Sequence, residues 1–146
     1  MAVQEVLGLR GFNEAVYMGT TALSGGLASS GNGQCGALSG SAVAISLNYG
    51  RDFSGQEDPE AYGKRQKKSY ELAKKLHDRF ITEYGSILCK DVQTKLMGRR
   101  FNFWDEKDKE AFLAAGGHVD KCTSVVGNAA KWTVEIMLDA EEKEEG

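Results

Sequence analysis

Apolar residues recur along most of this 146-residue chain at steps of three and four positions, the spacing of one face of an α-helix. The clearest case is residues 59–84, where lysines occupy the opposite face. Asp58 and Pro59 at its start and Gly85 at its end are typical helix start and stop signals. The pattern therefore predicts one long helix. Its apolar face consists of Leu72, Ala73, Leu76, Phe80 and Tyr84.

The same spacing predicts further helices separated by glycine-containing or polar connections. They cover residues 2–9, 14–24, 35–49, 87–97, 105–113 and 118–138. The charged stretch 139–146 is expected to fray. The two-residue alternation of a strand never lasts four residues outside segments that also fit a helix. We therefore expect an all-α fold, a compact bundle of five to seven helices in a single domain spanning residues 1–146.

The segment 35–49 is expected to be the central helix. It is nearly apolar all round, and such helices are usually buried. Its many glycines, alanines and serines would let neighbouring helices approach closely. The glycine-rich and serine-rich loop 26–34 before it either flexes or packs its backbone against a ligand or another helix. Packing does not call for so many glycines before a helix, which favours a functional role for Cys35 at the start of that helix. Gly33, Gly36 and Gly40 are the candidate cofactor-binding positions.

Composition narrows the classes of function. The net charge is −3, which gives no general attraction for nucleic acid or an anionic membrane. No apolar run approaches the ~20 residues of a transmembrane helix, and the first residues lack the basic region of a signal peptide. Three cysteines without such a signal indicate a reducing cytoplasm, where thiols are free, metal-bound or redox-active.

The three cysteines are the candidate reactive groups. Cys35 opens the central helix, where free backbone N–H groups and the helix dipole are expected to lower the pKa of a thiol. Cys89 lies near the start of the helix over 87–97, so the same reasoning applies to it. Cys122 follows His118 by four residues, which places thiol and imidazole on one helix face. Together they could form a Cys₃His metal set.

Three functions remain open at this point. In the first, Cys35 is a reactive thiolate that exchanges with disulfides or carries electrons, and Cys89 or Cys122 resolves the mixed disulfide. Its partner would be a redox protein or a small thiol. In the second, the same cysteines hold zinc or an iron–sulfur cluster, with His118 or an external ligand in the fourth place. In the third, the cysteines belong to the core of a helical interaction module, and the small-residue helix packs in a homodimer.

Several motifs together resemble a known family. Two glycines and an eight-residue spacer precede CGALSG, an apolar helix and YGR follow, and the later cysteines lie in EYGSILCKD and KCTSVV. This order is similar to that of the redox-active proteins named for the pattern C_GCAxxG_C_C, which are small and mainly helical. The resemblance implies that Cys35 is the cysteine of the CGAxxG motif and that Cys89 and Cys122 are the third and fourth cysteines. Ala2 occupies the position of the first cysteine.

Overall fold

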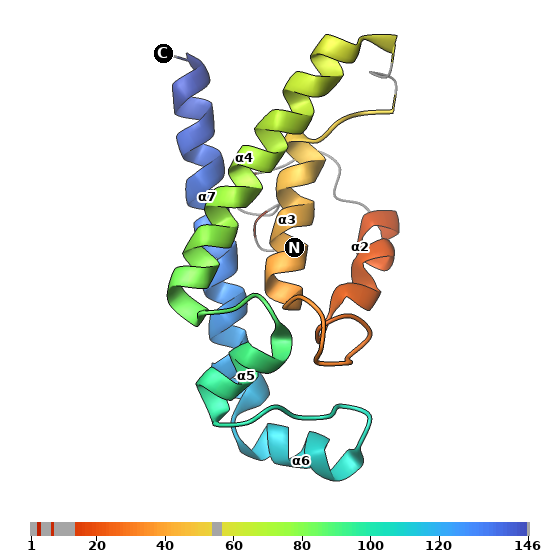
Figure 1. The fold of residues 1–146 in the computed structure, drawn as a ribbon, viewed down its shortest axis with the longest axis vertical. Coiled ribbons are helices and arrows are strands. Elements are labelled where there is room, and N and C mark those ends of the chain that lie inside the picture. Colours follow the sequence, from red (N-terminus) through yellow and green to blue (C-terminus); the bar gives the residue numbers. More distant parts are fainter. Residues whose placement is uncertain (1–2, 4–6, 8–13, 54–56, 146) are drawn as a thin grey trace.

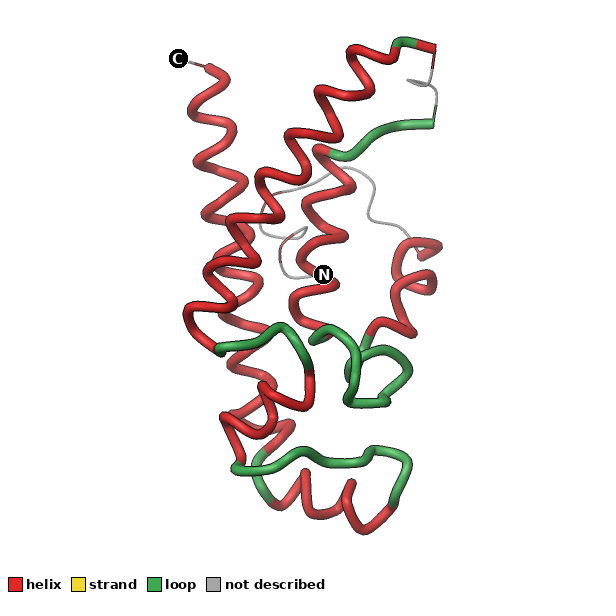
Figure 2. The backbone as a smooth tube through the Cα atoms, viewed as in Figure 1, coloured by secondary structure: helices red, strands yellow, loops and turns green. Residues whose placement is uncertain are grey.

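The computed structural model describes residues 3, 7, 14–53 and 57–145. Six α-helices lie within them, joined by loops (Figure 2). They are α2 (Glu14–Thr20), α3 (Gly36–Tyr49), α4 (Pro59–Tyr84), α5 (Cys89–Met97), α6 (Glu106–Ala114) and α7 (Cys122–Glu145). A 3-10 turn, η1 (Thr21–Leu23), follows α2, and a π-helical turn, η3 (Gly117–Lys121), precedes α7. The all-α prediction is confirmed. The expected helix over residues 2–9, like Ala2, lies almost entirely outside the described residues.

The three longest helices form the body of the molecule. α3 packs against both α4 and α7, and α4 packs against α7 (Figure 1). α5 and α6 lie at one end of this body, and η3 contacts both α6 and α7. α3 therefore has the central place that its composition predicts. None of the described helices is both long and apolar enough to cross a lipid bilayer.

The predicted apolar face of α4 faces the core. Leu72, Leu76, Phe80 and Tyr84 follow one another at four-residue steps, and each is at most 5% exposed. They meet buried residues of α3, α5 and α7, with Ile45 of α3 fully enclosed. These buried residues are Leu38, Ala44, Ile45, Val92, Val125, Ala129, Ile136, Met137 and Ala140. Burial of each large side chain of this kind stabilises the fold by about 1.5–3 kcal/mol.

The ends of α4 are set by local chemistry. The Asp58 carboxylate accepts hydrogen bonds from the N–H groups of Glu60 and Ala61, each at 3.1 Å. Pro59 at the first helical position has no N–H to satisfy. At the other end Gly85 adopts the left-handed conformation, with φ of 77°, and donates to the Ile81 carbonyl. The predicted bounds of this helix are confirmed.

The C-terminal helix differs from the prediction at both ends. The π-helical turn η3 interrupts the expected helix, so α7 begins only at Cys122. The ring of Phe112 packs directly against the Cα of Gly117, where no side chain would fit, which fixes this irregular turn. At the far end α7 continues past Leu138 as far as Glu145. The stretch expected to fray is thus helical over 139–145, because Ala140 is still buried in the core.

Candidate functional site

Cys35 and Cys89 are brought together by a short pairing of extended backbone. The bridge joins Gln34 to Leu88 in antiparallel fashion. The N–H of Cys35 donates to the Ile87 carbonyl (2.7 Å), and the N–H of Cys89 donates to the Gly33 carbonyl (2.9 Å). Side chains alternate between the two sides of paired backbone, so the residues on either side of the bridge share one face. The loop before α3 and the loop before α5 thereby place both cysteines on the same side.

A left-handed turn precedes this bridge. Five consecutive residues, Gly25–Ser29, have positive φ angles of 61°, 76°, 68°, 49° and 57°. Three of them are not glycine, and each such residue costs roughly 1–3 kcal/mol of backbone strain. Two hydrogen bonds stabilise the turn. The Ala28 N–H donates to the Ala22 carbonyl (2.7 Å), and the indole N–H of Trp104 donates to the Ala28 carbonyl (3.1 Å). The loop is therefore a structured element packed against the rest of the site.

Close packing of this loop explains Gly26 and two of the candidate cofactor-binding glycines, Gly33 and Gly36. A Cβ on Gly26 would lie 2.8 Å from the Cβ of Cys89. A Cβ on Gly33 would lie 2.6 Å from the Gly26 carbonyl oxygen, and one on Gly36 would lie 3.0 Å from the Cα of Ser24. The premise that packing does not require these glycines is wrong. Two backbone segments meet here more closely than any side chain allows.

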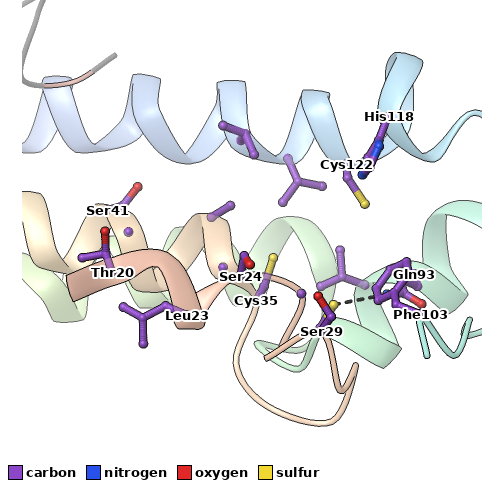
Figure 3. A pocket seen from close by; sticks show the side chains of 18 of the residues that line it. Thr20, Leu23, Ser24, Ser29, Cys35, Ser41, Gln93, Phe103, His118 and Cys122 are labelled. Atoms are coloured by element: carbon purple, nitrogen blue, oxygen red, sulfur yellow. Dashed lines mark hydrogen bonds between the residues drawn. The ribbon is translucent and has the colours of Figure 1, made fainter. Parts of the chain in front are cut away.

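The three cysteines line one cavity of about 960 Å³. Its walls come from α2, the loop after η1, α3, α5, α6, η3 and α7. Figure 3 shows Cys35 reaching into it from the start of α3, and Cys122 from the start of α7 with His118 beside it. Cys89 lines the same cavity from the start of α5. Three cysteines that are each more than thirty positions apart in the sequence thus line the same cavity.

One face of α3 forms one side of this cavity. The small residues of α3 that line it are Gly36, Ala37, Gly40, Ser41 and Ala44. Small residues on this helix were expected to let a neighbouring helix approach closely, but at Gly36 the close neighbour is the loop after η1. At Gly40, in contrast, an added Cβ would meet no atom within 4 Å. Of the three candidate cofactor-binding glycines, Gly36 and Gly40 line the cavity, whereas Gly33 is not among its lining residues.

The Cys35 thiol is less acidic than its place at a helix start suggests. Burial raises its pKa above the ordinary value of 9.0, and this outweighs the opposing effect of the Ala37 and Leu38 backbone N–H groups. Those two groups face the sulfur and favour the thiolate, although neither forms a cap hydrogen bond of full geometry. The expected lowering of the pKa by the helix terminus is therefore wrong, because desolvation is larger.

Cys89 has a hydrogen-bond partner that was not predicted from the sequence. Gln93, only 1% exposed, donates from Nε2 to the Cys89 Sγ at 3.2 Å, while its Oε1 accepts from the Phe101 N–H at 2.8 Å. Burial and the negative charge of a Cys35 thiolate raise the pKa of Cys89 to about 11, and the Gln93 bond opposes this rise. In the sequence, this hydrogen bond could have been inferred from a glutamine that follows a cysteine by one helical turn on a buried helix face.

Cys122 is also half-buried, and the geometry around it differs from the predicted metal set. Burial raises its pKa first, and a charge on Cys35 raises it further. His118 lies in the π-helical turn, not in α7, and its ring packs edge-on against Phe112 with centroids 5.0 Å apart. Among the described residues, no group of three or more histidine, cysteine, aspartate or glutamate side chains is arranged to hold a metal ion.

The environment of Cys89 gives a direct prediction about its reactivity. Replacing Gln93 with methionine removes a bond that lowers the pKa of Cys89, so alkylation of Cys89 should slow by about threefold at pH 8–9. Replacing Cys35 with serine removes a negative charge, so alkylation of Cys89 should become faster above pH 9. Peptide-resolved mass spectrometry of iodoacetamide modification between pH 7.5 and 10.5 measures both rates. Changes in the same direction for the two variants would contradict this account.

These features define a small all-helical thiol protein whose three cysteines lie around one apolar cavity. The chain belongs to the family described as "Putative redox-active protein (C_GCAxxG_C_C)", whose family model matches residues 1–136. The resemblance drawn from CGALSG and the later cysteines is thereby confirmed, and it extends over nearly the whole chain. No curated protein and no solved structure matches this chain.

Proposed function

We propose that the protein is a dithiol–disulfide redox protein of the reducing cytoplasm, in which Cys35 is the attacking thiol and Cys122 the resolving thiol. The observation that carries the proposal is that Cys35, Cys89 and Cys122 line a single cavity. Membership in a family described by redox activity supports it. A set of purely structural cysteines would not need to share a space that a reactant can enter.

Cys35 is proposed to ionise first. Its sulfur alone faces the backbone N–H groups at the start of α3, which stabilise negative charge. Cys89 and Cys122, in contrast, both have pKa values that rise further when Cys35 is charged. Nucleophilic attack needs the thiolate, so the first thiol to lose its proton begins the reaction.

Cys122 is proposed to resolve the mixed disulfide in preference to Cys89. When Cys35 is bonded to a substrate sulfur, its negative charge is gone, and burial remains as the cause that raises the pKa of Cys122. Cys89 remains more deeply buried and bonded to Gln93. Cys122 also approaches the cavity from α7, opposite Cys35 on α3 (Figure 3).

The reaction balances as a two-electron exchange. The Cys35 thiolate attacks one sulfur of a substrate disulfide, forms a mixed disulfide and expels the other substrate sulfur, which takes up a proton. The Cys122 thiolate then attacks the Cys35 sulfur and releases the second substrate thiol, which is protonated in turn. The protein dithiol has lost two electrons and two protons, and the substrate has gained both.

Redox titration tests this proposal. The protein is equilibrated with mixtures of reduced and oxidised dithiothreitol, quenched with N-ethylmaleimide and mapped by mass spectrometry. We expect one reversible disulfide, between Cys35 and Cys122, with Cys89 still a thiol at every ratio. Three thiols that persist under oxidising ratios would overturn the proposal and favour structural cysteines. A reversible disulfide that joins Cys35 to Cys89 would overturn the assignment of Cys122.

A further inference from the structure

The cavity that holds the thiols is large and apolar for a protein of this size. Its volume of about 960 Å³ is at the upper end of the ~300–1,000 Å³ that sites for drug-sized molecules occupy. No aspartate or glutamate belongs to the described residues that line it. The thiols alone would need far less space. The remaining volume suits an occupant that is mostly apolar and carries no positive charge.

Aromatic side chains line one end of the cavity. Phe103 and Trp104 come from the connector before α6, and Phe112 comes from α6 itself. Phe103 and Phe112 meet edge to face with ring centroids 4.8 Å apart. Trp104 lines the cavity and is 77% exposed, so its ring lies at the edge of the cavity next to solvent. Flat rings with this arrangement favour a planar ligand by stacking and edge contacts.

Polar side chains line both ends of the cavity: Thr20 and Ser41 lie at one end, and Gln93 and His118 lie at the other, next to Phe103 (Figure 3). His118 and Lys109 both line the cavity, and His118 packs against Phe112. An imidazole or ammonium N–H in this position can donate a hydrogen bond to a carbonyl oxygen of a ligand. Gln93 also lines the cavity, but its amide is already bonded to Cys89 and Phe101. The available donors therefore suit a ligand with one or two carbonyl groups on an otherwise apolar body.

We propose that the cavity binds an apolar, uncharged quinone and that the Cys35–Cys122 dithiol reduces it. This inference rests on the proposed function and names the electron acceptor for the same site. Two features favour a quinone over a hydrophilic disulfide such as oxidised glutathione: the apolar walls, and the aromatic end with carbonyl-directed donors. A peptide-like disulfide with several carboxylates would lose much of its hydration against these walls, and Lys109 is the single lysine or arginine among the described lining residues that could compensate for this loss.

The transfer balances without a further reactant. Cys35 and Cys122 lose two electrons and two protons and form one S–S bond. The quinone takes up both electrons and both protons and leaves as the hydroquinone. No net charge is created in the apolar cavity, which suits thiols that burial keeps protonated near neutral pH.

Gly40 provides the variant that separates the ligand from the thiols. A Cβ added at Gly40, which lines the cavity, meets no atom within 4 Å, so we expect the side chain of Gly40→Leu to take up space in the cavity. Gly63 in α4 is the matched control: it is also helical and exposed, also has open space around it, and does not line the cavity. Both changes replace a helical glycine by a strong helix former, so neither should unfold the protein.

Binding is measured with decylubiquinone, whose ring has no free position for thiol addition. In a Trp132→Phe background Trp104 is the sole tryptophan, since the chain has two, and quenching of its fluorescence reports occupancy. We expect saturable quenching that weakens by at least about tenfold in Gly40→Leu and stays within about twofold in Gly63→Leu. Equal affinity for the two leucine variants, or no saturable quenching, would overturn the quinone site.

Turnover distinguishes failure of this inference from failure of the proposed function. Under anaerobic conditions reduced protein and decylubiquinone should yield one hydroquinone for each two thiols lost, with no adduct mass on the protein. If the dithiothreitol titration gives the Cys35–Cys122 disulfide but the quinone neither binds nor reacts, the quinone site fails and the redox function stands. If the quinone binds, equally in a Cys35→Ser variant, but no disulfide ever forms, the redox function fails.

Discussion

Replacing Cys35 with serine should lower the rate of disulfide formation with oxidised dithiothreitol by at least about 100-fold, because the attacking thiolate is lost. Under the proposed mechanism we expect neither Cys89 nor Cys122 to replace it at the same rate. The other two cysteines lack the backbone N–H groups that face Cys35 at the start of α3. The measurement is the loss of free thiols with time, followed by quenching and mass spectrometry.

Two further variants, Cys122→Ser and Cys89→Ser, test the roles assigned to the other two cysteines. Cys122→Ser should retain the first attack and accumulate a mixed disulfide on Cys35, because the resolving thiol is missing. Cys89→Ser should react within about threefold of the wild-type rate, because Cys89 takes no part in either step. Circular dichroism spectra and melting curves check that all three variants fold. A loss in Cys89→Ser as large as in Cys35→Ser would contradict the assigned roles.

Replacing Gly26 with alanine should destabilise the fold by roughly 3 kcal/mol. Gly26 has a φ of 76°, and a Cβ there would lie 2.8 Å from the Cβ of Cys89 and 2.9 Å from the carbonyl carbon of Gly31. Backbone strain and the steric overlap both act against the folded state. Urea unfolding followed by circular dichroism measures the change in free energy.

Gly85→Ala is the matched control for this prediction. Its φ of 77° is almost the same, but a Cβ there meets no atom within 4 Å. Only the strain of the left-handed conformation applies, so we expect a loss of about 1 kcal/mol. The difference between the two variants isolates the close approach of the loop to Cys89. Equal destabilisation would mean that the loop can move away from Cys89 at little cost.

The fold followed from local signals wherever those signals were strong. Asp58, Pro59 and Gly85 fixed the ends of α4 because caps act within one helical turn. The four-residue spacing of Leu72, Leu76 and Phe80 identified its buried face. The end of α7 could not be read in this way, because the burial of Ala140 depends on the packing of another helix. The π-helical turn was missed for the same reason, since the Phe112 ring that packs on Gly117 arrives from α6.

For the candidate site, too, some features were determined by the sequence and others only by the tertiary structure. Sequence alone determined which residue types are present: three cysteines, the CGALSG motif before an apolar helix, and the family to which these belong. Tertiary structure alone decided that Gln34 pairs with Leu88, that the small face of α3 borders a cavity, and that Gln93 holds the Cys89 sulfur. It also reversed the expected acidity of Cys35. A helix terminus acts locally, whereas desolvation is set by every chain segment that surrounds the sulfur, and those segments meet only in the folded protein.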